Sequence, residues 1–233
     1  MLINADFSRR AVVHAGRLDW TPSPMAGVER RMLDRIGDEV ARATSIVRYA
    51  RGSSFSAHTH SGGEEFLVLQ GIFQDEQGDC PAGSYVRNPP RSRHTPRSET
   101  GCVIFVKLHQ FGPDDRTHVR LDTNRMEGIA DASRPGASMT PLFKDARETV
   151  RIETIAPRTS VEAGDRGGYE MLVIEGELHG IGETFGLQSW MRLPPGDRVR
   201  LAAGAQHARI WVKTGHLRDA ISSAAKEQAG SDL

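Results

Sequence analysis

The chain has 233 residues, of which 38% are hydrophobic and 26% are charged, a composition typical of a folded globular protein. Lys plus Arg and Asp plus Glu each number 30, so the formal net charge is zero and no positive field favours nucleic-acid binding. No apolar run approaches the roughly 20 residues of a membrane span, and Met1 to Val13 lacks a signal-peptide core. Cys80 and Cys102 form no CxxC pair and fit a reducing compartment. We therefore expect a cytoplasmic protein that binds neither nucleic acid nor membranes.

Short β-leaning runs separated by glycine and proline dominate the chain. Val28 to Ile36 is expected to form a short helix, and strands are expected at Thr44 to Tyr49, Phe66 to Leu69 and Cys102 to Leu108. Turn residues recur between these runs as they do in β-sandwiches and barrels. Good helix formers with apolar residues four apart predict a terminal helix over Leu217 to Ala229. The sequence thus predicts an all-β protein with a short C-terminal helix.

An internal repeat divides the chain into two halves. Three segments recur in the same order: Glu65-Phe-Leu-Val-Leu-Gln-Gly71 as Glu170-Met-Leu-Val-Ile-Glu-Gly176, Tyr85-Val-Arg-Asn-Pro-Pro90 as Trp190-Met-Arg-Leu-Pro-Pro195, and Ile104-Phe-Val-Lys107 as Ile210-Trp-Val-Lys213, the last one residue out of step. Such a repeat indicates duplication. We expect two similar β domains, residues 1–120 and 121–233, joined within Thr117 to Ser138, where apolar periodicity disappears.

Metal-ligand chemistry is concentrated in the first half. His58 and His60 form a His-x-His pair, and on a strand both rings face the same side and can bind one ion. The glycines that follow can turn the chain, so that Glu64 enters the next strand beside the pair. His94, which follows a later turn, is the fourth candidate. Imidazole suits zinc, iron, copper, nickel and manganese, so these four residues predict a transition-metal site without selecting the metal.

Residues next to these candidates are expected to surround the site. By strand parity, Phe66, Val68 and Gln70 share the face of Glu64 and supply a mainly apolar surround. Glu65 and Arg87 are candidates for a supporting shell around the ligands. The catalytic residues, if there are any, are not identified by the sequence.

The spacing Gly-x5-His-x-His-x3-Glu-x6-Gly from Gly52 to Gly71 resembles the first motif of the cupin superfamily. The second cupin motif is partly kept, as Pro81-Ala-Gly83 and Pro90-Arg-Ser-Arg-His94, without its usual final Asn. This resemblance implies two tandem cupin barrels, each a double-stranded β-helix or jelly roll. It also implies His58, His60, Glu64 and His94 as metal ligands of the first barrel.

The residues around these motifs, His58 to Gly71 and Tyr85 to His94, are most similar to the ChrR-type cupin-like domain of anti-sigma factors. That resemblance implies a domain that binds zinc and responds to singlet oxygen or organic peroxide. In that family a separate N-terminal domain binds a sigma factor through a His-x3-Cys-x2-Cys helix. Residues 1–45 contain His14 and no Cys, so sigma-factor binding is not carried over. We expect one divalent metal per chain, zinc in first place, with iron, manganese and nickel as alternatives.

The second half lacks the ligands. In the register of the repeat, the four ligand positions are held by Ala163, Asp165, Tyr169 and Val199. We therefore expect this half to be structural, packing against the first barrel or forming a homodimer surface.

Two functions remain open at this point. The first is a metal-binding regulator that senses oxidative stress or binds a small molecule or oxidant. The second is a dioxygenase that uses iron, manganese or nickel on a small chelating substrate, with Glu65 or Arg87 supporting the ligands. A third role, holding a regulatory protein partner, is weakened by the missing N-terminal motif.

Overall fold

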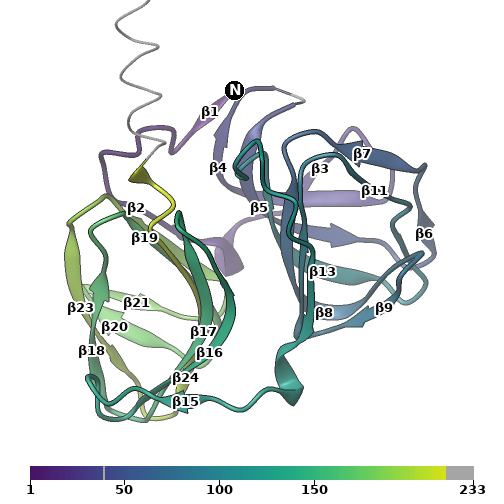
Figure 1. Cartoon of the computed structure of the whole chain (residues 1–233). Helices are drawn as coiled ribbons and strands as arrows, with labels where there is room; N and C mark the ends of the chain where they lie inside the picture. Colours follow the sequence, from purple (N-terminus) through teal and green to yellow (C-terminus); the bar gives the residue numbers. More distant parts are fainter. Residues whose placement is uncertain (39, 219–233) are drawn as a thin grey trace, which may run out of the picture. The chain divides into compact units, whose positions relative to one another are not determined.

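The chain divides into two compact units (Figure 1). In this computed structural model, residues 1–38 and 40–218 are described. Unit 1 comprises Met1–Ala5 and Arg17–Met126, and unit 2 comprises Asp6–Gly16 and Glu127–Leu233. Over the described ranges, no helix is long and apolar enough to cross a membrane. The helix expected over Leu217 to Ala229 lies almost entirely outside the described residues.

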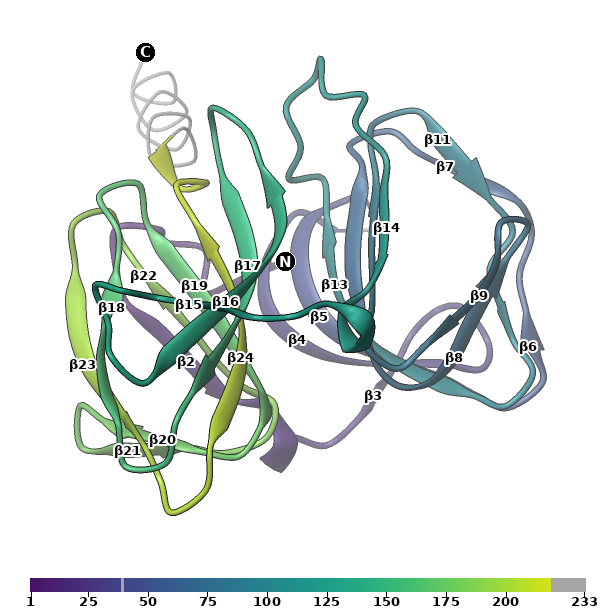
Figure 2. The same ribbon diagram turned by 60° about the horizontal axis from the view of Figure 1, so that its bottom comes forward.

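Unit 1 is built around a large antiparallel sheet. Its main path runs β1 (Leu2–Ile3), β4 (Val28–Ile36), β5 (Arg42–Tyr49), β13 (Cys102–Leu108), β8 (Glu64–Asp75), β10 (Ser84–Asn88) and β14 (Val119–Asp122). Four short strands branch from this path: β3 (Thr21–Pro22), β6 (Ser53–Ser54), β9 (Gly78–Pro81) and β12 (Arg97–Ser98). A separate two-stranded sheet pairs β7 (His58–His60) with β11 (Ser92–His94), side by side in Figure 2. A 3-10 turn, η2 (Thr123–Arg125), follows β14.

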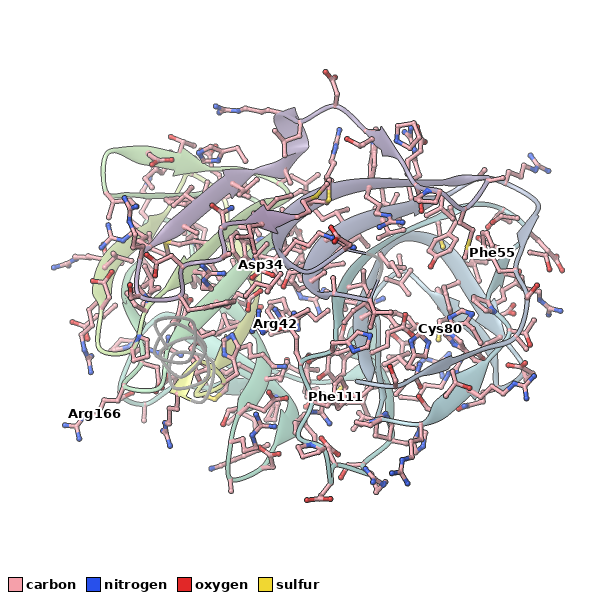
Figure 3. All side chains as sticks on the ribbon, turned by 90° about the horizontal axis from the view of Figure 1, so that it is seen from above. Asp34, Arg42, Phe55, Cys80, Phe111 and Arg166 are labelled. Atoms are coloured by element: carbon pink, nitrogen blue, oxygen red, sulfur yellow. The ribbon has the colours of Figure 1, made fainter. Side chains whose placement is uncertain are left out.

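The interior of unit 1 is an apolar cluster to which β8, β10 and β13 each contribute alternate side chains. Phe66 and Val68 of β8 lie in it with Val86 of β10, as strand alternation requires. Both cysteines are free and buried in the same cluster, with Cys80 labelled in Figure 3. Burial raises the pKa of Cys102 to about 11, so this thiol stays protonated at neutral pH.

The expectation of a helix at Val28 to Ile36 was wrong, because this segment is strand β4. It pairs with β5 along its length and with β1 and β3 on its other side. Its Glu, Arg, Met and Leu residues favour helix locally, but hydrogen bonding to strands on both sides overrides that preference. A bulge between Met32 and Asp34 turns the Asp34 side chain inward near Arg42, and the two are labelled in Figure 3.

Unit 2 has two antiparallel sheets. The larger follows the order β15 (Ile129–Ala130), β16 (Ala137–Lys144), β17 (Thr149–Ile155), β24 (Ala208–Thr214), β19 (Tyr169–Glu175), β22 (Ser189–Leu193) and β2 (Ala11–His14). The smaller follows β18 (Ser160–Gly164), β23 (Arg198–Ala203), β20 (Leu178–Gly180) and β21 (Glu183–Phe185). The edge strand β2 comes from the start of the chain and is followed by a 3-10 turn, η1 (Ala15–Arg17). Part of the expected N-terminal extension of the first domain therefore completes the second unit.

The sequence repeat corresponds to equivalent strands in the two units. Tyr85 lies opposite Leu67 on β8, and Trp190 lies opposite Leu172 on β19. Tyr85 donates a hydrogen bond of 2.5 Å to Glu65, and the Trp190 indole donates one of 2.7 Å to Glu170. Each unit thus keeps the same buried pair on the same two strands, and the prediction of an all-β, duplicated fold is confirmed.

Candidate metal centre

Three histidines converge in unit 1, on the paired strands β7 and β11. His58 lies directly opposite His94 in the register of the pair, while Thr59 between the two β7 histidines points outward and is exposed. Strand alternation therefore places His58 and His60 on the inner face, beside His94. The ring centroids of His60 lie 4.8 Å from those of both other histidines, and those of His58 and His94 are 5.0 Å apart. One nitrogen from each ring lies within 4.8 Å of the others.

Glu64 adds a carboxylate to this cluster. It is the first residue of β8, and its Oε2 lies 3.3 Å from His60 Nε2 and 3.7 Å from His94 Nε2. The side-chain amide of Asn88 donates a hydrogen bond of 3.2 Å to the same oxygen. Glu64 is 5% exposed, so its charge is held inside the barrel by polar neighbours rather than by water. The turn between His60 and Glu64 brings the two side chains together, as the spacing predicted.

The donor set fits a metal ion. His58 Nδ1 lies 3.1 Å from the carbonyl oxygen of Ser56, which can only accept, so this nitrogen carries the proton and Nε2 is free to bind. His60 Nε2 and His94 Nε2 are 2.9 Å apart. Two ligands about 2.1 Å from one ion are about 3.0–3.4 Å apart at octahedral or tetrahedral angles, so the spacings of His60 to His94 and to Glu64 need little adjustment.

The protonation of the cluster also suits metal binding. Burial lowers the pKa of His60, and it outweighs the opposing effect of Glu64. A neutral imidazole is the form that coordinates a metal. Burial acts in the same direction on His94, but Asp75 and Glu64 outweigh it there and raise its pKa. The pKa shifts of the two histidines thus have opposite directions, downward for the more apolar environment of His60 and upward for His94 beside Asp75 and Glu64.

Asp75 and Arg120 support His94 from the side of the ring away from Glu64. Asp75 Oδ2 lies 3.8 Å from His94 Nδ1, and Arg120 donates hydrogen bonds of 3.0–3.3 Å to the two Asp75 oxygens. Burial alone would raise the pKa of Asp75, but the polar contacts with His94 and Arg120 lower it to about 2. Sequence reasoning missed both residues. Their contact joins the last residue of β8 to a residue of β14, and no sequence motif indicates that these two strands bring their side chains together.

The expected surround is only partly present at the site. Phe66 and Val68 lie in the core that adjoins the cluster, on the face of Glu64. Glu65 and Arg87 lie on the opposite face of their strands, where Glu65 accepts from Tyr85 and Arg87 pairs with Asp115 at 3.0 Å. A bulge in the β8–β13 pairing ends the alternation before Gln70, whose side chain is exposed. The structure therefore does not bring Glu65, Gln70 or Arg87 to the histidines.

Unit 2 has the same backbone arrangement without ligands. Ala163 lies directly opposite Val199 in the β18–β23 pair, as His58 lies opposite His94 in the first unit. Both residues are buried in the apolar core of unit 2 together with Tyr169, which stands at the position of Glu64. Apolar side chains therefore fill the space that the histidines occupy in unit 1.

Replacing Glu170 with Ala should destabilise unit 2 and leave metal binding unchanged. Glu170 is 1% exposed and accepts hydrogen bonds from Trp190 and, at 2.9 Å, from His216. Its removal leaves buried donors without this acceptor, at a cost of about 3 kcal/mol in the free energy of unfolding. Denaturant unfolding and elemental analysis of the same sample measure the two effects. A loss of bound metal in a still folded variant would show that unit 2 contributes to the site.

Comparisons with known proteins agree with this architecture. Residues 8–112 match the family model of the ChrR Cupin-like domain, and no curated protein sequence matches the chain. Among solved structures, a Nostoc punctiforme protein proposed to be a dioxygenase superposes with a TM-score of 0.71 at 14% identity, over 94% of this chain and 83% of that chain. The pirin YhhW from Escherichia coli, in complex with nickel(II), gives a TM-score of 0.63 at 11% identity, over 89% of this chain and 99% of that chain. A variant of oxalate decarboxylase from Bacillus subtilis gives a TM-score of 0.59 at 10% identity, over 88% of this chain and 77% of that chain.

At sequence identities this low, the similarity to solved structures establishes only the fold. The family model is more specific, because it matches residues 8–112 to one type of cupin-like domain. The neighbours bear out the expected pair of jelly-roll barrels, and the first barrel carries the cluster of histidines. Residues 8–112 are therefore similar to the ChrR-type cupin-like domain, and the chain as a whole has the cupin fold.

Proposed function

We propose that unit 1 binds one divalent transition metal, zinc in first place, through His58, His60, Glu64 and His94, and that this centre gives the protein a regulatory role in sensing oxidants or binding a small molecule. The observation that carries the proposal is the convergence of three imidazoles, each with a nitrogen within 4.8 Å of the others, beside a buried carboxylate. A bound zinc ion would supply a positive centre that holds these four groups together.

The ligands come from three strands, so metal binding is coupled to the folding of unit 1. His58 and His60 belong to β7, His94 to β11 and Glu64 to β8. The two-stranded β7–β11 sheet shares no strand with the large sheet. Joining it to β8 through common ligands stabilises the folded unit, because the metal binds the folded arrangement and not the unfolded chain. Loss of a ligand therefore loosens this part of the barrel.

Oxidant sensing at this site would act through the imidazoles rather than through a thiol. Cys80 and Cys102 are 1% and 4% exposed, and burial raises the pKa of both, which suppresses the reactive thiolate. His58 is partly exposed and is the ligand that an oxidant from solution meets first. Modification of a ligand would release the metal and with it the restraint on β7 and β11.

A second candidate function is a metal-dependent dioxygenase acting on a small chelating substrate. The fold similarity to the Nostoc protein favours it, as does the donor count, because four protein ligands leave two positions open on an octahedral ion. In that case His58, His60, Glu64 and His94 hold the ion, and the substrate binds at the open positions. The chemistry would then be supplied by iron, manganese or nickel.

Metal analysis separates the two functions. After anaerobic purification from a medium that contains zinc, iron, manganese and nickel, we expect about one metal ion per chain. Zinc with four protein ligands in X-ray absorption spectra, released on exposure to singlet oxygen or an organic peroxide, supports the regulatory role. Iron or manganese with bound water, and oxygen consumption with a chelating acid or diketone, supports the enzyme. A protein that takes up none of these metals when they are added in excess contradicts both.

A further inference from the structure

Two sets of hydrogen-bonding side chains can be compared between the units, because the repeat fixes which positions correspond. The set on the outer faces of the strands is kept in both units: Glu65, Tyr85, Arg87 and Lys107 correspond to Glu170, Trp190, Arg192 and Lys213. A feature present in both units, with and without the histidines, is explained by the fold. A feature present only in unit 1 calls for another reason.

Asp75 and Arg120 are such a feature. The offset that matches Gly71 with Gly176 places Gly180 at the position of Asp75. Arg120 lies opposite Val86 on β10, and in the second unit Val12 lies opposite the matching Met191 on β22. The Asp75–Arg120 ion pair is thus replaced by a glycine and a valine in the unit that also lacks the histidines. The pair and the ligands occur together.

The geometry of the pair is directed at a ligand. The Asp75 side chain is 1% exposed and lies 3.8 Å from His94 Nδ1, while the Nε2 atom of the same ring faces His60 and Glu64. His94 Nδ1 is buried and makes no hydrogen bond within the described residues. Arg120 holds the carboxylate with both terminal nitrogens and is itself fixed by the carbonyl oxygen of Gly78 at 3.0 Å.

We propose that Asp75, held in place by Arg120, is a positioning residue that makes His94 a metal ligand. The carboxylate is placed to accept a hydrogen bond from Nδ1–H, which fixes the tautomer in which the lone pair at Nε2 points at His60 and Glu64. A small rotation of the His94 ring closes the 3.8 Å gap to a hydrogen bond when Nε2 binds the ion. The inference rests on the proposed metal site and adds a residue from the far end of β8 to it.

Zinc affinity of Asp75→Asn, measured by chelator competition, tests the proposal. We expect binding about 10–100-fold weaker than in the unaltered protein, since loss of an outer carboxylate has that effect on histidine ligands. Because a lone Arg120 charge could impair folding, the double variant Asp75→Asn/Arg120→Gln removes both charges with little change in shape and should show a similar loss. Asp131→Asn is the matched control, because Asp131 forms an ion pair of 2.6 Å with Arg134 in unit 2.

A readout specific to positioning is the ¹⁵N spectrum of the histidine rings in the zinc-bound protein. In the unaltered protein His94 should carry its proton at Nδ1, with a shift typical of a strong hydrogen bond, and Asp75→Asn should change that signal and leave the signal of His58 unchanged. If the unaltered protein binds zinc and both variants bind it equally well with the same His94 signal, the positioning role is wrong. If the unaltered protein binds no zinc, the proposed metal site fails and the positioning role fails with it.

Discussion

His60→Ala is expected to abolish metal binding and to remove the stabilisation that the metal gives to unit 1. His60 is the central residue of the cluster, with its ring centroid 4.8 Å from those of both other histidines and its Nε2 3.3 Å from Glu64. With three donors left, we expect metal content to fall from about one ion per chain to a small fraction. At a free metal concentration 1,000 times the dissociation constant, the lost stabilisation is about 4 kcal/mol.

The measurement separates metal loss from simple loss of packing. Thermal unfolding of both proteins is recorded with zinc and with a chelator, and the difference between the two conditions is the quantity compared. It should be large for the unaltered protein and near zero for His60→Ala. His207→Ala serves as a control, because His207 is a half-exposed histidine of unit 2 paired with Glu175 at 2.9 Å. Equal metal content in His60→Ala and the unaltered protein would rule out the assignment of the site.

Local spacing was sufficient to predict the centre of the site. The His-x-His pair, the glycine turn and Glu64 lie within seven consecutive residues, so strand alternation and one turn determine their geometry. His94 is more distant in the sequence, but β11 pairs with β7 in a register that sets it opposite His58. The same pairing is found in unit 2, where Ala163 lies opposite Val199.

Features that depend on contacts between distant segments could not be predicted. Asp75 reaches His94 only because β8 extends over 12 residues, from Glu64 to Asp75, so that the side chain of its last residue lies 3.8 Å from His94 and accepts hydrogen bonds from Arg120. Arg87, which the sequence placed near the ligands, has the opposite strand parity to Asn88, and Asn88 is the residue that reaches Glu64. Strand β2 joins unit 2 from the start of the chain, and no local pattern indicates which edge a short strand will cover.

The apolar residues at the matching positions of unit 2 also explain why its core is continuous. Tyr169, Ala163 and Val199 belong to one buried apolar cluster, whereas the corresponding place in unit 1 holds three imidazoles and a carboxylate. Buried polar groups are costly unless they are paired, so unit 1 carries a cost that unit 2 has removed. A metal ion would offset this cost, and the same reasoning predicts that unit 1, without metal, is the first of the two to unfold.

Gly71→Ala is expected to destabilise unit 1 strongly, by about 4 kcal/mol, whereas Gly52→Ala costs about 1 kcal/mol. Both glycines frame the histidine motif and both have positive φ, +69° at Gly71 and +73° at Gly52. A Cβ at Gly71 would lie 2.0 Å from the carbonyl oxygen of Gly101, a backbone atom that cannot move away, while a Cβ at Gly52 meets nothing within 4 Å.

Comparing Gly71→Ala with Gly52→Ala therefore separates the cost of the steric conflict from the cost of the backbone conformation, since φ is nearly the same at both positions. Denaturant unfolding with metal and with chelator measures the two costs. Gly176→Ala should reproduce the effect in unit 2, because its Cβ would lie 2.2 Å from the carbonyl oxygen of His207, yet it should leave metal content intact. Equal stability of Gly71→Ala and Gly52→Ala would show that the close approach of Gly71 to Gly101 tolerates a side chain, and the steric argument would then be wrong.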